Sequence, residues 1–473
     1  MPRPPTSWRE TYERHLLALR ARSGVPGIGV TLFTADDVLL SRGLGFRDRE
    51  AGSPVTDDTL FGIASITKSF TALAVLHLVT DGRLSLDDPV SKHLPFTLWD
   101  GREPARIRHF LSHTSGLPAL PTMDWVRAPS QLGDPVTGRQ AEKRVANPVP
   151  DVRTPERLVA WIDANAVLLG EPGEVFSYSN DAFCLLGAIV ERVACRPFEG
   201  FVEERIARPL GMARTTFDLE RVLADPDHST LYERDETGTV LPSPRWETTA
   251  RLLGGGMLKS TLGDLRRYVR YLMAPASVDR TSGGPDIDPE LVRAMSGAHT
   301  WSGPGRTYGF GLITQTDHHG VTLVGHGGSL KGVSSQIGWA PELGLGGVVL
   351  SNLVDIPSEG VWVSGVNALT GVPVDARSYA PGSYAASAAE VAAVLGRYAS
   401  GEPYGRLRLY LGEGGALRAS VGDPETDVPA RFAAADEIAL TFPEHEAPAT
   451  LLRGAPGELR GVTYGLRVLL REA

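Results

Sequence analysis

Apolar positions along this chain follow two different spacings, and each spacing predicts a different kind of element. In residues 27–48 apolar and polar side chains alternate on both sides of Asp36 and Asp37, which predicts a β-hairpin. Apolar positions that recur every three or four residues predict helices elsewhere in the first three quarters of the chain. The predicted helices cover residues 7–22, 65–82, 104–112, 154–168, 180–195, 197–208, 261–273 and 358–371.

Further alternating runs lie close together in the sequence before the last of these helices. They cover residues 307–316, 320–328, 334–342 and 345–353, and short turns separate them. This spacing predicts one antiparallel meander, which the helix at 358–371 follows.

One long segment, residues 118–151, matches neither spacing. It is rich in Pro and polar residues and shows no apolar period. Connections of this length without secondary structure are usually active-site lids or disordered segments. We therefore expect a lid-like loop at 118–151.

The composition changes near residue 372. Residues 373–385 are rich in Pro, Gly, Ser and Ala, as linkers are. Residues 386–473 contain short alternating runs with turn residues every eight to twelve positions, which predicts a separate small all-β domain. The sequence therefore predicts a first domain over 1–372, a linker over 373–385 and a β-domain over 386–473.

The charge of the chain excludes some classes of partner. The net charge is −9 and the pI is near 5.7, and no basic run interrupts this acidic balance. The basic surface expected of a nucleic-acid binder is therefore missing. The N-terminal stretch lacks the apolar core of an export signal, and no run is long enough to span a bilayer. We expect a cytoplasmic protein without a nucleic-acid or membrane partner.

Cysteine and histidine give no sign of a disulfide or of a metal site. Cys184 and Cys195 both fall on the helix predicted at 180–195, where they would lie roughly 16 Å apart. This separation is too large for a disulfide and agrees with a reducing compartment. Since no His/Cys cluster has metal-ligand spacing, no metal or cofactor is expected.

The first candidate for chemistry is Ser65 with Lys68, at the start of the helix predicted at 65–82. Residues three apart on a helix share one face. Burial of the amine near Phe61, Ile66 and Phe70 would favour its neutral form, which can take the serine proton. Arginine could not do this, because its guanidinium stays protonated. Alternatively, Ser65 only caps the helix and Lys68 is solvated.

Two further motifs could converge on Ser65. Tyr178 and Asn180 stand just before an apolar helix and would present a phenol and an amide. His326 ends a strand before Gly327 and Gly328, and glycines in a strand permit close approach of a ligand to the backbone. In the simpler alternative Asn180 caps its helix, Tyr178 packs and His326 is a turn residue.

The order and spacing of these three motifs resemble the penicillin-recognising serine hydrolases. The resemblance is to the branch that holds class C β-lactamases, DD-peptidases, D-aminopeptidases and esterases, and it covers about residues 20–370. Four longer stretches resemble this branch too. They are RHFLSHTSGLP, EPGEVFSYSN, GGGMLKSTLGDLRRYVRYL and GHGGSLKGVSSQIGWAP.

The resemblance implies a role for each matching residue. Ser65 would be the nucleophile that forms an acyl-enzyme, and Lys68 and Tyr178 would move its proton and protonate the leaving group. Asn180 would bind Lys68 and the substrate amide. The backbone N–H groups of Ser65 and Ser329, the residue after the Gly pair, would form the oxyanion hole.

His326 departs from the family pattern, because many members carry Lys at this position. A histidine is mostly neutral at pH 7 and should hold a substrate carboxylate less firmly than an ammonium group. This departure argues against penicillinase activity and favours acyl donors that lack an adjacent carboxylate.

The resemblance also implies a β-lactamase/transpeptidase-like α+β fold. An antiparallel sheet would be flanked by the N- and C-terminal helices, with an all-helical lobe inserted and Ser65 at the lobe boundary. Residues 386–473 look like the lipocalin-like domain of some members, which would be a scaffold or would shape the cleft. Solvated strand faces are expected for its arginines rather than a carboxylate anchor. These arginines are Arg453, Arg460, Arg467 and Arg471.

Three hypotheses about function remain open. The preferred one is a penicillin-binding-protein-type thioesterase that takes a peptidyl thioester from a carrier protein and releases it by cyclisation, with a D-residue at the acyl terminus. The second is a carboxylesterase or D-amino-acid-specific peptidase acting on a small-molecule substrate, with a β-lactamase as a weaker form. The third is a non-catalytic binding protein, which the intact set of motifs disfavours.

Overall fold

The computed structural model describes residues 5–146, 149–277, 284–402, 405–422, 425–443, 445–454 and 457–472. Within these ranges, no helix has both the length and the apolar composition that crossing a membrane requires.

The two cysteines do not form a disulfide. Cys184 is buried, Cys195 is exposed, and both are free thiols.

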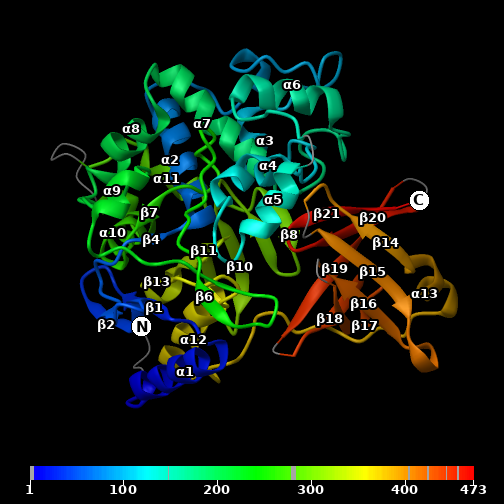
Figure 1. Ribbon diagram of the computed structural model, residues 1–473. Helices are drawn as coiled ribbons and strands as arrows, with labels where there is room; N and C mark the ends of the chain where they lie inside the picture. Colours follow the sequence, from blue (N-terminus) through cyan, green and yellow to red (C-terminus); the bar gives the residue numbers. More distant parts are fainter. Residues whose placement is uncertain are drawn as a thin grey trace.

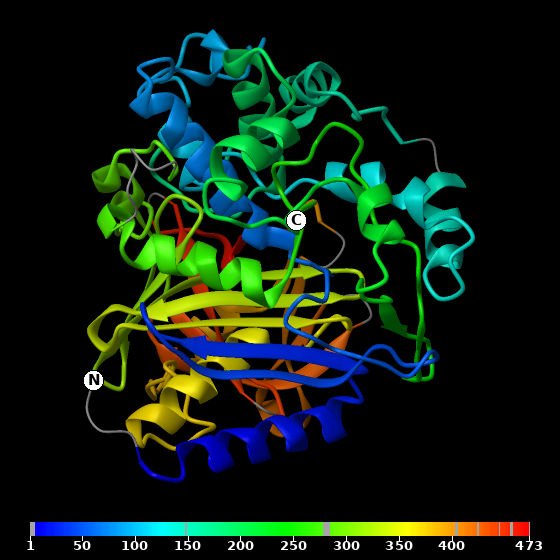
Figure 2. The ribbon, with the colours of Figure 1, turned by 90° about the vertical axis from the view of Figure 1, so that its left-hand side faces the viewer.

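A nine-stranded antiparallel sheet forms the centre of the first domain (Figures 1 and 2). Its strands run in the order β3-β2-β1-β13-β12-β11-β10-β9-β8. The predicted hairpin and meander are both part of this sheet. The bounds are β1 Gly27–Phe33, β2 Val38–Asp48, β3 Ser53–Pro54, β8 Thr300–Gly303, β9 Arg306–Tyr308, β10 Ile313–His318, β11 Val321–Leu330, β12 Val333–Ala340 and β13 Leu345–Ser351.

Helices cover both faces of this sheet, so β1, β12 and β13 are buried along their whole length. Helices α1 (Trp8–Ser23) and α12 (Ser358–Thr370) lie on one face, and α10 (Leu262–Met273) lies on the other (Figure 2). The Trp362 indole of α12 packs directly over Gly338 and Gly347, where a Cβ atom would lie within 2.5 Å of it. Glycine at these two positions therefore lets the helix approach the sheet.

A helical lobe is inserted between the first strands and the meander. The short strands β4 (Phe61–Gly62) and β7 (Lys259–Ser260) pair where the chain enters and leaves this lobe. Its central helix, α2, is buried on nearly all sides, as expected of a helix that is apolar all round. Helix α2 covers Thr67–Thr80. The other helices of the lobe are α3 Ile107–Leu111, α4 Thr122–Arg127, α5 Gly138–Ala146, α6 Pro155–Asn165, α7 Asn180–Ala194, α8 Phe198–Val202 and α9 Leu219–Ala224, and α11 (Pro289–Ala294) follows later in the chain.

The expectation of a loop without secondary structure at 118–151 was wrong. This segment contains α4, a 3₁₀ turn (Ala128–Gln131) and α5. The helices are short, and α5 has mostly charged positions, so neither gives a clear apolar period. The segment is also held in place, because the buried carboxylate of Asp134 pairs with Lys331 at 2.8 Å.

The C-terminal domain is a closed eight-stranded barrel, which confirms the predicted all-β, lipocalin-like fold (Figure 1). Strand β14 pairs with both β15 and β21 and so closes the ring. A capped helix, α13 (Ala388–Val394), precedes it. The strands are β14 Gly396–Ala399, β15 Arg406–Leu411, β16 Leu417–Val421, β17 Thr426–Ala434, β18 Glu437–Thr441, β19 Glu446–Arg453, β20 Leu459–Tyr464 and β21 Arg467–Arg471.

The barrel docks on the helical lobe through backbone contacts. The Tyr178 N–H donates to the Leu466 carbonyl at 2.9 Å, and the Gly401 N–H donates to the Ala119 carbonyl at 3.0 Å. The turn between β20 and β21 therefore lies against the segment that carries Tyr178.

Candidate active site

Ser65 lies at the junction of the sheet and the helical lobe. It is part of a 3₁₀ turn, Ala64–Ile66, that leads directly into α2. Ala64 has a φ of 46°, an uncommon conformation for a residue with a side chain, and such strain often accompanies functional sites. Gly328 of β11 lies against this turn, because a Cβ there would come within 2.4 Å of the Ile63 carbonyl oxygen.

Lys68 is fully buried, one turn along α2 from Ser65. Its Nζ lies 3.1 Å from Ser65 Oγ, 2.8 Å from Asn180 Oδ1 and 2.6 Å from the Gly255 carbonyl oxygen. The alternative of a solvated lysine is therefore wrong. The amine has three oxygen neighbours, and one of them is the candidate nucleophile.

Tyr178 and Asn180 reach the same place from the start of α7. Ser179, and not Asn180, caps this helix, because its hydroxyl accepts the Ala182 N–H. The Asn180 amide is therefore available to Lys68. The Tyr178 ring lies 4.8 Å from Lys68 Nζ. Ser179 therefore has the structural role of capping α7, and its neighbour Asn180 contributes to the site.

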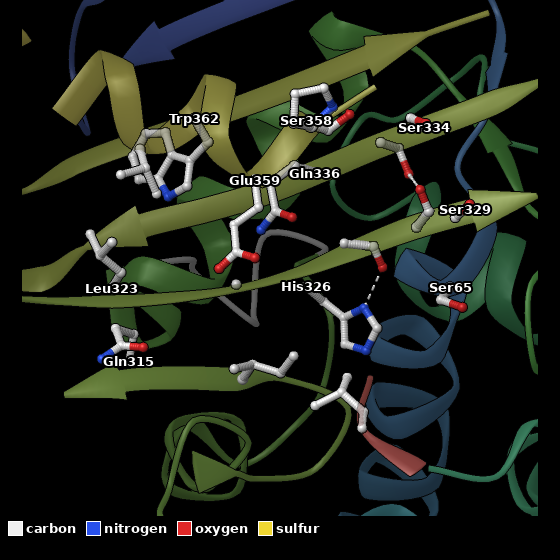
Figure 3. A pocket seen from close by; sticks show the side chains of 18 of the residues that line it. Ser65, Gln315, Leu323, His326, Ser329, Ser334, Gln336, Ser358, Glu359 and Trp362 are labelled. Carbon is white, nitrogen blue, oxygen red and sulfur yellow. Dashed lines mark hydrogen bonds between the residues drawn. The ribbon is translucent and has the colours of Figure 1, made fainter. Parts of the chain in front are cut away.

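The third motif lies along an open edge of β11. Strand β10 pairs with β11 only as far as Gly325, so His326 and the residues after it pair with β12 alone. A pocket of about 570 Å³ follows this edge, and Ser65, Tyr178 and the stretch from His326 to Ser329 all line it. Figure 3 shows Ser65, His326 and Ser329 at the same end of the pocket.

A chain of hydrogen bonds fixes the tautomer of His326. The Ser179 N–H donates to His113 Nδ1 at 3.0 Å, so His113 Nε2 carries the proton and donates to the Tyr308 hydroxyl at 3.2 Å. The Tyr308 hydroxyl then donates to His326 Nε2 at 3.1 Å, and His326 Nδ1–H donates to the Gly327 carbonyl at 2.6 Å. Both ring nitrogens of His326 are therefore engaged by the protein.

Burial keeps the hydrogen-bonded side chains of His113, Tyr308 and His326 neutral. It lowers the pKa of His326 to about 3, and the charge of nearby Lys68 adds to the shift. Burial likewise holds the pKa of His113 well below 6.5 and raises the pKa of Tyr308 well above 10. The imidazole at the position where many relatives carry Lys is therefore uncharged near neutral pH.

The barrel contributes two charged residues to the site. Arg467 lies over the Tyr178 ring, 4.7 Å from its centre, and its Nε donates to Glu402 Oε2 at 2.7 Å. Glu402 Oε1 accepts from Asn180 Nδ2 at 3.1 Å. The expectation of a solvated strand face is therefore wrong for Arg467, whereas Arg453, Arg460 and Arg471 are exposed.

Several groups of this site were not assigned from the sequence. His113 lies in the RHFLSHTSGLP stretch and Tyr308 lies in the first run of the predicted meander, but the sequence predicts no role for either. Gly255 lies in the GGGMLKSTLGDLRRYVRYL stretch, but nothing there singles out its carbonyl. Glu402 carries no signal in the sequence, because only the fold brings it next to Asn180. Among the described residues, no group of three or more His, Cys, Asp or Glu side chains has the arrangement of a metal site.

The sequence of this chain is similar to those of known proteins. Protein flp of Staphylococcus aureus (strain MW2) is 31% identical over 343 residues, which is 70% of this chain. The chain spans 60% of the length of that relative.

Solved structures show the same relationship. The octameric penicillin-binding protein homologue from Pyrococcus abyssi is 27% identical with a TM-score of 0.68, and the match covers 98% of this chain and 99% of that one, the barrel region included. A D-stereospecific amidohydrolase from Streptomyces sp. is 26% identical with a TM-score of 0.60, over 76% of this chain and 98% of that one. The model of the beta-lactamase family matches residues 12–361. The chain therefore belongs to the beta-lactamase family, among the serine hydrolases related to penicillin-binding proteins.

Proposed function

We propose that this protein transfers acyl groups through an acyl-enzyme on Ser65. The observation that carries the proposal is the placement of Lys68 Nζ between Ser65 Oγ, Asn180 Oδ1 and the Gly255 carbonyl. The amide and carbonyl oxygens can only accept hydrogen bonds, so they take two N–H groups of the amine. In its unprotonated form the amine then directs its lone pair towards Ser65.

The proposed first step is attack by Ser65 on the acyl carbon. The hydroxyl proton passes to Lys68 as the bond from Oγ to carbon forms, and negative charge develops on the carbonyl oxygen. The backbone N–H groups of Ser65 and Ser329 are the proposed donors to this oxygen, and both residues line the pocket. Collapse of the intermediate breaks the bond to the leaving group, which receives the proton through Tyr178.

The preferred acyl donor is a peptidyl thioester with a D-residue at the acyl terminus, delivered by a carrier protein. The similarity to a D-stereospecific amidohydrolase supports the stereochemical part of this proposal. The barrel hydrogen-bonds to the 118–151 segment at Gly401 and Ala119, and two barrel residues, Leu466 and Arg467, form part of the wall of the pocket. Such walls favour an internal amine over water, because aminolysis requires a high effective concentration of the acceptor.

The nucleophile is tested by covalent labelling. A fluorophosphonate should add one adduct to the intact protein, and the adduct should map to the peptide that contains Ser65. The Ser65→Ala variant should not be labelled, whereas Ser69→Ala, a change one turn further along the same helix, should keep the label. Equal labelling of Ser65→Ala and the parent would disprove the assignment.

The acyl donor is tested with a linear peptidyl thioester that ends in a D-residue. A product lighter than the free acid by one water supports cyclisation. If only the free acid forms, or if simple esters react while the thioester does not, the esterase or D-peptidase hypothesis replaces the thioesterase.

The cytoplasmic location expected from the sequence stays a prediction.

Penicillin hydrolysis is the weakest candidate activity. His326 supplies no cation for the carboxylate of a penicillin, and the cation that the barrel brings, Arg467, is already paired with Glu402. We therefore expect slow turnover of benzylpenicillin and fast turnover of an uncharged p-nitrophenyl ester. A penicillin rate close to the ester rate would contradict this argument.

A further inference from the structure

Glu402 is a charged residue of the barrel domain that contacts a motif residue of the first domain. It stands in the connection between β14 and β15, and its side chain is 14% exposed. One carboxylate oxygen accepts from Asn180 Nδ2 at 3.1 Å, and the other accepts from Arg467 Nε at 2.7 Å. Glu402 does not line the pocket that holds Ser65. It reaches the site through Asn180 and through Arg467, which lines the pocket.

The donors and acceptors at this contact define one orientation of the Asn180 amide. An ion-paired carboxylate accepts hydrogen bonds and cannot donate them. The amide must therefore turn its NH₂ group to Glu402 and its oxygen to Lys68, as the 2.8 Å contact with Nζ shows. Without this carboxylate the opposite orientation would become accessible, and an NH₂ group would then face the donating amine.

We propose that Glu402 is a positioning residue that the barrel supplies to the active site. It holds the Asn180 amide so that Oδ1 accepts from Lys68, which leaves the third position of the amine for Ser65. Arg467 in turn holds Glu402, and its second contact, from Nη1 to the Gly465 carbonyl at 3.1 Å, anchors it to its own turn. This inference rests on the proposed acylation of Ser65.

A simpler role for Glu402 would be to dock the barrel on the lobe. The two roles differ in what they predict for Asn180. A docking role would also act through Arg467, which Glu402 holds over the Tyr178 ring, so part of its loss would add to the loss of Asn180. A positioning role acts only through Asn180, so the two losses would not add.

The test uses the full chain and the burst of acylation with p-nitrophenyl acetate, an ester too small to need the barrel for binding. Glu402→Gln keeps the shape but can donate as well as accept. We expect it to lower the acylation rate constant about tenfold, equivalent to about 1.4 kcal/mol, with little change in KM. In the Asn180→Ala background the same change should have no further effect.

A matched control separates positioning from docking. Arg460→Gln removes another contact between barrel and lobe, the bond from Arg460 to the Leu169 carbonyl at 3.2 Å, without touching Asn180. It should acylate at the parental rate. If Glu402→Gln leaves an unpaired arginine that prevents folding, the double variant Glu402→Gln/Arg467→Gln removes both charges and is measured in the same way.

The outcomes are distinct. A parental rate in a folded Glu402→Gln variant, or an additive loss in the Asn180→Ala background, overturns the positioning role and leaves the acyl-enzyme intact. If the parent itself forms no acyl-enzyme on Ser65, both the proposed function and this inference fail.

Discussion

The chemistry of the site depends on groups that can only accept hydrogen bonds. Lys68 is enclosed by the oxygens of Asn180 and Gly255, so its remaining position faces Ser65. His326 is fixed from both sides, because its Nδ1–H donates to the Gly327 carbonyl and its Nε2 accepts from the Tyr308 hydroxyl. At this scale, function follows from the number of donors and acceptors that each buried side chain presents.

Replacing Lys68 tests the role of the amine. We expect Lys68→Arg to slow acylation at least about 100-fold, nearly as much as Lys68→Ala, because a guanidinium cannot take the serine proton. Stopped-flow acylation with a p-nitrophenyl ester measures both variants. Substantial activity of Lys68→Arg would show that charge, rather than proton transfer, is what the site requires.

The neutral histidines predict a loss of stability in mild acid. Their pKa values in the folded state lie below the ordinary 6.5, to about 3 for His326, because burial and the charges of Lys68 and, for His113, Arg467 oppose protonation. Below about pH 6.5 the unfolded chain therefore binds protons that the folded chain does not. The contribution of the neutral histidines to the free energy of unfolding is present above that pH and is lost as the pH falls towards 3.

Urea unfolding between about pH 7 and about pH 4.5 measures this loss. Each histidine should contribute a slope of up to about 1.4 kcal/mol per pH unit. His326→Asn, whose amide can still donate to the Gly327 carbonyl, should show a shallower slope by about that amount. Identical slopes for the variant and the parent would mean that His326 is protonated in the folded protein.

At the scale of elements, three segments meet at Ser65. The turn before α2 carries Ser65, the proposed nucleophile, the start of α7 carries Tyr178 and Asn180, and the open edge of β11 forms one side of the pocket. The 118–151 segment supports this junction, because Asp134 accepts from Lys331 in the turn that follows β11. The segment is therefore tied to the end of β11, the strand that carries His326 and Ser329.

The anchor of this segment can be removed. Asp134 is fully buried and Lys331 is 5% exposed, so Lys331→Met should reduce the free energy of unfolding by about 3–5 kcal/mol by leaving a buried carboxylate without its cation. Lys92→Met, which breaks an exposed pair with Asp88, should cost about 1 kcal/mol or less. Denaturant unfolding compares them. Equal effects would show that the 118–151 segment is not held by this pair.

At the scale of the whole molecule, the barrel contributes residues to the candidate active site and is not only an appended domain. Its β20–β21 turn bonds to the backbone of Tyr178, and its side chains reach Asn180 and the Tyr178 ring. The sequence left open whether this domain is a scaffold or shapes the cleft, and these contacts favour the second role.

A wedge at the interface tests this role. A Cβ at Gly401 would lie 2.6 Å from the Ala119 carbonyl oxygen and 3.0 Å from Pro121 Cδ. Gly401→Val should therefore displace the barrel and lower the acylation rate by about tenfold or more. Arg408→Ala, on an exposed position of β15, should have no effect. Faster proteolysis at residues 373–385 with unchanged acylation would separate barrel docking from catalysis.

The amino-acid sequence is enough to predict most elements and the local part of the site. The spacing of apolar positions predicts the hairpin, the meander, most helices and the all-β domain, because burial of one face imposes the period of each element. Ser65 and Lys68 are one helical turn apart, so their contact also follows from the sequence. The resemblance in the order of the motifs extended this to Tyr178, Asn180 and the His326 stretch.

Which distant groups complete the site depends on how the chain folds. The Gly255 carbonyl, the neutral state of His326 and the contact of Glu402 with Asn180 depend on segments that are far apart in the chain. The periodic pattern of the sequence does not encode such contacts. Every residue has a backbone carbonyl, and the sequence does not distinguish a solvated Glu or Arg from one that is paired in the folded protein. The apolar pattern does not predict the short helices at 118–151 for a related reason. Packing and the Asp134–Lys331 pair stabilise them, and not an apolar pattern of their own.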